Sequence, residues 1–304
     1  MEDTLDATTV REWGERYSNE GRWGRDDILG TLNFIGPERV RAACALPRRG
    51  LVVSCALPFD RRVARGGEET GEPQRPGADA AGEPAGESAA LMGSPAPGLD
   101  TQWSSRARVF CGGHSSGSRG AERRRGAAPW RDPIQDGVVG RGVLLDLPRF
   151  LRHPWLDGGT RVLPRDLDNC AEAMGVTVER GDIVLLRTGR LTRCFYKGSW
   201  RGYRDGAAPG LSVHCARWLY EREVAAVASD TWNLEVIPNE TNTYDQMLDE
   251  IALGKTGLLL GKTFHLDTLS EACAADGEYA FLFTAPLLPA LGAVGYPINP
   301  LAIK

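Results

Sequence analysis

The chain has 304 residues, of which 42% are hydrophobic and 25% are charged, and its formal net charge is −4. This composition is typical of a globular protein and excludes a disordered or collagen-like chain. The small negative charge gives no global attraction to nucleic acid or to an anionic membrane. No apolar run approaches the roughly 18 residues of a membrane span, and residues 1–3 are acidic rather than the basic start of a signal peptide. We therefore expect a cytoplasmic protein with no membrane partner.

The first hundred residues predict only two regular elements. Pro37 at a first helical position and Glu38 in the first turn predict a helix from 37 to about 46. An apolar run predicts a strand over 51–57. Residues 60–98 are mostly Gly, Pro, Ala and Glu. Such a segment cannot offset its ordering entropy by burial, so we expect a flexible loop or insertion.

A second irregular stretch, residues 112–132, is rich in arginine and glycine. It contains no interleaved aromatic residues and no known nucleic-acid-binding module. We therefore expect a solvated loop here and no nucleic-acid partner.

Residues from 138 onward alternate short apolar runs with helical patterns. The apolar runs predict buried strands at 143–147, 183–187, 224–228, 258–260 and 280–283. Helices are predicted at 166–174, at 212–222 with Ser212 as N-cap, and at 267–275 with Gly277 beyond the end. This alternation favours an α/β fold in one domain spanning 1–304, with a mixed sheet and flanking helices.

Several segments together resemble the cyclase family of metal-dependent hydrolases, which includes kynurenine formamidase and isatin hydrolase. The matching pieces occur in the family's order, at residues 23–33, 100–103, 139–146, 181–189, 228–232 and 292–300. The resemblance implies a swivelling β/β/α-like fold and assembly as a homodimer or homotetramer.

Family enzymes bind zinc or manganese through a segment of the form His-x-Gly-Thr-His-x-Asp-x-x-x-His and through a later His and Glu. Aligned on Thr101, this pattern places Gly98 and Gln102 at the first two histidines, Ser104 at the aspartate and Arg108 at the last histidine. The register near the carboxyl end places Asp249 at the later His and Lys262 at the Glu. Glycine offers no ligand, and Arg108 and Lys262 are cations, so we expect neither a bound metal nor another cofactor.

The replaced residues predict a metal-independent site. A fixed arginine at position 108 can stabilise an oxyanion, and Lys262 can act as base or nucleophile. Asp249 can pair with either cation or serve as a general base. The resemblance also places Trp103, Trp232 and Trp23 around the pocket, where they would stack on a flat substrate.

Three functions stay open at this stage. The first is a metal-independent cyclase-family enzyme of secondary metabolism that acts on a small aromatic or polyketide-like substrate by ring closure, hydrolysis or elimination. The second is a conventional metal-dependent amidohydrolase of the arylformamidase type, and the third is a non-catalytic binding protein. The four histidines have no metal-ligand spacing. Asp230 follows an apolar strand, which is typical both of site residues and of helix caps.

Overall fold

A computed structural model of the chain describes residues 7–24, 27, 29–57, 98–100, 109–110, 114–115, 137–240, 247–286 and 295–304. The strands are β1 (Val52–Ser54), β2 (Gly98–Asp100), β3 (Val109–Phe110), β4 (His114–Ser115), β5 (Val138–Asp146), β6 (Arg161–Val162), β7 (Ile183–Arg187), β8 (Gly210–Leu211), β9 (Ala226–Ser229), β10 (Leu259–Lys262), β11 (Ala280–Ala285), β12 (Gly295–Pro297) and β13 (Leu301–Ile303). The helices are α1 (Ala7–Arg16), η1 (Gly30–Phe34), α2 (Pro37–Cys44), α5 (Leu147–Leu151), α6 (Pro164–Ala173), α7 (Arg190–Lys197), α8 (Cys215–Glu221), α9 (Met247–Asp249), η2 (Glu250–Thr256) and α10 (Asp267–Asp276).

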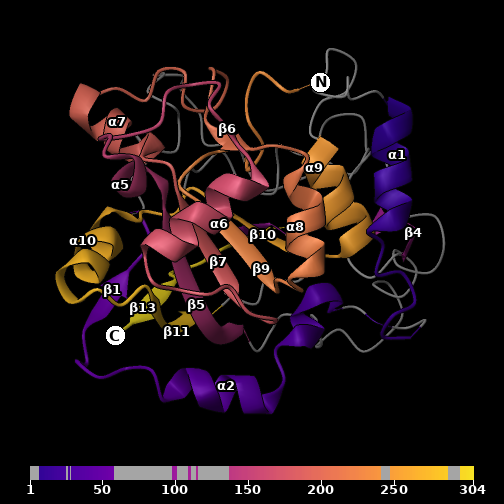
Figure 1. The fold of residues 1–304 in the computed structure, drawn as a ribbon, viewed down its shortest axis with the longest axis horizontal. Coiled ribbons are helices and arrows are strands. Elements are labelled where there is room, and N and C mark those ends of the chain that lie inside the picture. Colours follow the sequence, from indigo (N-terminus) through magenta and orange to yellow (C-terminus); the bar gives the residue numbers. More distant parts are fainter. Residues whose placement is uncertain are drawn as a thin grey trace, which may run out of the picture.

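The centre of the fold is a nine-stranded sheet in the order β1-β13-β11-β5-β7-β9-β10-β2-β12. Four neighbouring strands, β5, β7, β9 and β10, run parallel, and the strands on both sides of them pair antiparallel. Helices α6 and α8 lie in front of the parallel strands, and α10 and α2 lie toward the β1 side and the lower edge in Figure 1. The parallel strands therefore end at one common edge of the sheet, which carries the candidate site.

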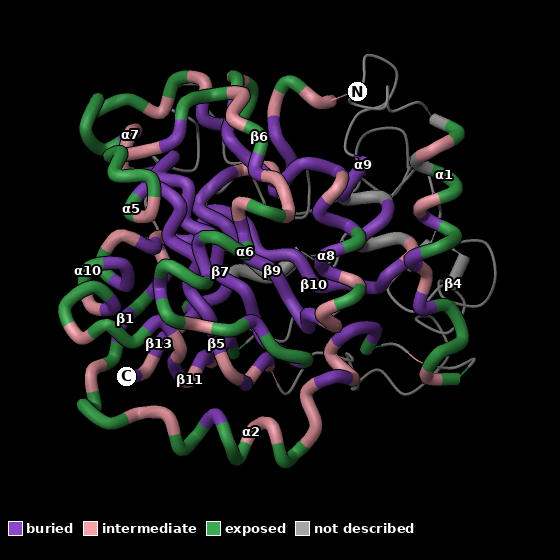
Figure 2. Tube along the Cα trace, viewed as in Figure 1, coloured by how far each residue is buried: buried purple, intermediate pink, exposed green. Residues whose placement is uncertain are grey.

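The parallel strands form the core. Every residue of β7, β9 and β10 is buried, and Figure 2 shows this part of the chain as continuously buried. Strands covered on both faces need apolar side chains at successive positions rather than at alternate ones. By contrast, β11 alternates buried and half-buried residues, as expected of a strand with one covered face.

The predicted α/β fold with a mixed sheet is confirmed. Helix α2 begins at Pro37 as predicted, and α10 ends just before Gly277, whose backbone has φ 73°. The five predicted core strands correspond to β5, β7, β9, β10 and β11. The predicted strand over 51–57 is shorter, because only 52–54 pair with β13.

Several helices differ from the sequence predictions, among them α1, which was not predicted, and α8 and α7. Helix α8 begins at Cys215 rather than just after Ser212, because the Glu240 carboxylate accepts hydrogen bonds from the Ser212 hydroxyl (2.9 Å) and the Val213 N–H (2.7 Å). These contacts hold 212–213 outside the helix. Helix α7 was not predicted, since its eight residues are a short segment with glycine at both ends.

Residues 60–97 and most of 112–132 lie outside the described residues, so the predictions for these segments stay predictions. Within the second segment, His114 and Ser115 form β4, a short strand paired with β3, where we expected a loop. No helix in the described ranges combines the length and the apolarity of a membrane span.

Candidate active site

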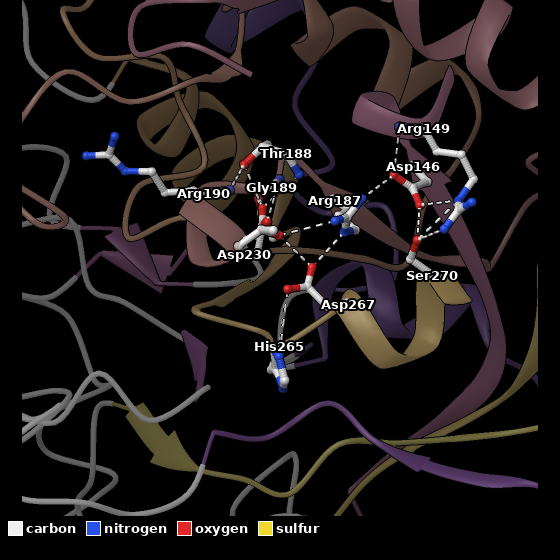
Figure 3. Close-up of polar contacts among 12 residues, drawn as sticks. Asp146, Arg149, Arg187, Thr188, Gly189, Arg190, Asp230, His265, Asp267 and Ser270 are labelled. Atoms are coloured by element: carbon white, nitrogen blue, oxygen red, sulfur yellow. Dashed lines mark hydrogen bonds and ion pairs between the residues drawn. The ribbon is translucent and has the colours of Figure 1, made fainter. Parts of the chain in front are cut away.

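Charged side chains gather where the parallel strands end. Asp146 is the last residue of β5, Arg187 of β7 and Lys262 of β10, and Asp230 directly follows β9. Figure 3 shows the polar contacts of Asp146, Arg187 and Asp230. Ligands of open α/β sheets commonly bind beyond the carboxyl ends of the strands, which makes this edge the candidate site.

Arg187 is the centre of the largest polar network. Its Nη1 lies 2.8 Å from Asp146 Oδ1, and its Nε lies 2.9 Å from Asp267 Oδ1 at the start of α10. Burial by itself lowers the pKa of Arg187, but the two carboxylates outweigh it and the pKa is raised. Asp146 also accepts hydrogen bonds from Arg149 and Ser270. Because each of these charges has a partner, the network fixes the ends of β5 and β7 relative to α10.

Asp230 holds the turn between β7 and α7. Its side chain accepts hydrogen bonds from the N–H and the hydroxyl of Thr188 (2.8 and 2.7 Å) and from the N–H of Gly189 (2.7 Å). Burial raises the pKa of Asp230 to about 6, although the bonds from Thr188 oppose the change. Asp230 therefore acts across strands much as an N-cap acts within a helix.

Lys262 is buried, with 4% of its surface exposed, and it lies directly across from Gly98 in the pairing of β10 with β2. The next residue, Thr263, has φ 62°, a value that β-branched residues adopt rarely. The Thr263 N–H donates to the Thr231 carbonyl at 3.0 Å. Strained backbone of this kind is concentrated at functional sites, and here it directs the chain away from the sheet just after Lys262.

An aromatic cluster lies next to this edge. Buried Tyr203 packs with Leu57, Leu191 and Cys194, and the half-buried rings of Trp200 and Trp232 pack against this group. The Tyr203 hydroxyl donates to the Asp230 carbonyl at 3.1 Å. The Arg204 guanidinium lies 4.2 Å from the centre of the Trp232 ring, a cation–π distance.

Comparisons with known proteins agree with this architecture. The model of the Cyclase family matches residues 99–236. A crystal structure described as a novel cyclase is 26% identical, with a TM-score of 0.70, and the alignment covers 96% of this chain and 99% of that chain. Residues 99–236 therefore match the cyclase family, and the chain as a whole has the fold of that cyclase. Isatin hydrolase A from Ralstonia solanacearum is a more distant structure, 19% identical with a TM-score of 0.48 over 68% of this chain and 70% of that chain. A search of curated proteins found no match.

The structure brings together two of the residues that the family pattern selects. Lys262 and Trp232 both lie at the carboxyl edge, where the N–H of Thr263 donates to the carbonyl of Thr231. Asp249 ends α9, which is held beside Glu235 by a hydrogen bond from the Leu248 N–H (2.8 Å). The remaining predicted catalytic and stacking residues, Gln102, Trp103, Ser104 and Arg108, lie outside the described residues.

Trp23 lies elsewhere in this cyclase-family fold. Its ring contacts Phe34 of η1, with 5.1 Å between the ring centres. The hydroxyl of Thr31, also in η1, donates to the Ala225 carbonyl just before β9. Trp23 is therefore near the amino ends of the parallel strands, at the edge opposite Lys262. The structure therefore does not bring Trp23 together with Lys262 or Trp232.

The site also includes residues that sequence analysis did not select as site residues. Asp146, Arg187 and Asp267 form a network, and Arg190 and Tyr203 lie beside Asp230. A signal for two of them was present, since Asp146 and Arg187 directly end apolar runs. Within the described ranges, no three His, Cys, Asp or Glu side chains are arranged to hold a metal ion.

Proposed function

We propose that the protein is an enzyme that acts without a metal on a small aromatic or polyketide-like substrate, by ring closure, by hydrolysis of a C–O or C–N bond, or by elimination. The family match supports a cyclase- or hydrolase-type enzyme. The observation that carries the finer proposal is the buried side chain of Lys262 at the carboxyl edge, across from Gly98.

The donor chemistry at this pair of strands does not fit a divalent cation. The family pattern puts a histidine ligand at position 98 and a glutamate at position 262. Here the first position has no side chain, and the second is a lysine. A protonated amine has no lone pair to donate to a metal and repels a divalent ion. The residues therefore favour chemistry that uses the side chains of this chain alone.

Lys262 is suited to electrostatic catalysis. An ammonium group in a water-poor site stabilises negative charge that develops on a carbonyl oxygen more strongly than it would in water. The network of Asp146, Arg187 and Asp267 keeps the strand ends in place, so the ammonium group needs little reorganisation during the reaction. In the proposal, Arg108 adds a second positive charge, and Asp249 moves a proton. Ser104 and Gln102 contribute hydrogen bonds, and Trp232 and Trp103 pack on the substrate.

The test is the variant Lys262→Met, assayed on a panel of aromatic esters, amides and lactones. We expect kcat/KM to fall about 100- to 1,000-fold, the range for removing one oxyanion-stabilising group. Lys255→Met is the matched control, because Lys255 is half-buried on η2 and its stem packs on Gly14. This control should keep full activity.

The metal part of the proposal is tested on the same preparation. We expect elemental analysis to find less than stoichiometric zinc and manganese, and a chelator to leave the activity unchanged. Stoichiometric metal together with loss of activity on chelation would establish a conventional metal-dependent hydrolase instead. Equal activity of the wild type and Lys262→Met would remove Lys262 from the mechanism.

A further inference from the structure

Arg190, the first residue of α7, carries a buried positive charge that no carboxylate in the described part of the chain pairs with. Only 2% of its surface is exposed. One Nη group donates to the Gly202 carbonyl, and no described residue accepts a hydrogen bond from Nε. Among the described residues Arg190 forms no ion pair, whereas buried Arg187 three residues earlier has two. An arginine stays protonated at any working pH, so this charge costs free energy unless an anion approaches it.

The Asp230 carboxylate cannot supply that partner. Asp230 attracts Arg190 from a distance, but the oxygens of Asp230 already accept the three hydrogen bonds from Thr188 and Gly189. Figure 3 shows the Arg190 side chain extending away from the Asp230 carboxylate. Burial is the main cause that lowers the pKa of Arg190, and nearby Arg193 lowers it further. A bound anion would therefore supply the charge partner that this buried guanidinium lacks among the described residues.

The surroundings indicate what kind of anion fits. The interval 190–204 contains five basic residues, Arg190, Arg193, Lys197, Arg201 and Arg204, and no acidic residue, in a chain whose net charge is −4. The same segment supplies Trp200 and Tyr203, which pack in one cluster with Trp232. Positive charge and aromatic rings are thus presented together next to the end of β9.

We propose that Arg190 binds the carboxylate of an aromatic substrate or ligand whose ring packs against the cluster of Trp200, Tyr203 and Trp232. A guanidinium group offers two parallel donors that match a carboxylate. This inference deepens the proposed function by naming an aromatic carboxylate as the substrate class, and it rests on that function for the statement that the ligand is also the substrate.

The test compares benzoate with benzamide, its neutral isostere, as ligands of the full-length protein. Binding is measured by calorimetry and by the shift in thermal midpoint. We expect benzoate to bind saturably and benzamide to bind roughly tenfold or more weakly, because the amide lacks the charge-assisted hydrogen bonds. Arg190→Gln should weaken benzoate binding roughly 10- to 100-fold. Arg190→Lys should retain part of the affinity through its charge. Arg41→Gln, an exposed site on α2, is the matched control and should bind as the wild type does.

A purely structural role for Arg190 predicts a different result. Glutamine can still donate to the Gly202 carbonyl, and the unpaired charge is removed, so we expect ligand-free Arg190→Gln to have a thermal midpoint equal to or above that of the wild type. A lowered midpoint with an unchanged response to benzoate would overturn the anion site. If Arg190→Gln does not fold, two other results would overturn the anion site. One is that the wild-type protein binds benzoate and benzamide with equal affinity. The other is that Arg190→Met binds benzoate as tightly as the wild type does.

The same probes separate this inference from the proposed function. Benzoate binding that depends on Arg190, combined with full activity of Lys262→Met, would leave the anion site in place and overturn the role of Lys262. Equal binding of benzoate and benzamide, combined with an inactive Lys262→Met, would overturn the anion site alone.

Discussion

At the residue scale, the candidate site depends on where each buried charge finds its partner. Arg187 pairs with Asp146 and Asp267, which are 41 and 80 positions away in the chain. The sequence indicates that a charged residue ends an apolar strand, but local patterns contain no information about partners at such separations. For the same reason the sequence could not show that Arg190 lacks one.

Asp230 offers a direct test of this buried network. We expect Asp230→Asn to lower the free energy of unfolding by about 2–4 kcal/mol, because the amide presents a donor toward groups that themselves donate and loses charge-assisted hydrogen bonds. Urea denaturation at pH 7.5 measures the change. Asp157→Asn, at an exposed position, should stay within about 0.5 kcal/mol of the wild type. Equal effects of the two substitutions would show that the bonds to Thr188 and Gly189 contribute nothing to stability.

At the element scale, the entry into α7 is the feature that shapes the edge of the site. Gly189 has φ 78°, and a Cβ atom on it would lie 2.7 Å from both Cα and Cβ of Trp155. Gly198 at the other end of α7 has φ 59°, with no atom within 4 Å of such a Cβ. The two glycines share a left-handed backbone, but only Gly189 lies in close contact with another segment.

The pair Gly189→Ala and Gly198→Ala separates backbone strain from crowding. We expect Gly198→Ala to cost about 1 kcal/mol of unfolding free energy, the strain of a left-handed alanine. Gly189→Ala should cost about 3 kcal/mol or more, because the steric overlap with Trp155 adds to the same strain. It should also weaken benzoate binding, since α7 carries Arg190. Chemical denaturation of both variants measures the difference, and equal losses would contradict close packing at Gly189.

At the scale of the whole molecule, the sheet joins distant parts of the chain and leaves a carboxylate buried at its amino edge. Asp182 precedes β7, and its Oδ2 accepts hydrogen bonds from Arg141 and from the Glu179 N–H (both 2.7 Å). Its Oδ1 is buried and has no hydrogen-bond partner in the described part of the chain. Burial raises the pKa of Asp182 to about 6 from an ordinary value of 3.8, although Glu179 and Arg141 oppose the change.

This raised pKa predicts how stability depends on pH. Between about pH 4 and 6 the folded protein holds a proton on Asp182 that the unfolded chain has released, so this contribution is complete below pH 3.8 and is lost as the pH rises through 6. The wild type should therefore lose on the order of 2 kcal/mol more than Asp182→Asn between pH 4 and pH 6.5. Urea titrations at several pH values measure both slopes. Parallel curves would show that Asp182 titrates normally.

Local sequence determined a large part of this fold. Apolar runs of three to five residues specify β5, β7, β9 and β10, because strands covered on both faces need apolar side chains at successive positions. Pro37 and Gly277 mark a helix start and a helix end through backbone preferences that act within one turn. The motifs spread along the chain were also enough to identify the cyclase family, which the comparisons confirm.

Only the tertiary structure decided how these elements combine. The pairing of β10 with β2 places Lys262 across from Gly98, and the turn after β9 places Trp232 near Tyr203 while Trp23 goes to the opposite edge. Each of these relations joins residues that are separated by many positions and is selected by the packing of the whole sheet. The physical reason is that backbone preferences act over a few residues, whereas strand order and the balance of buried charges depend on every element that meets at the edge.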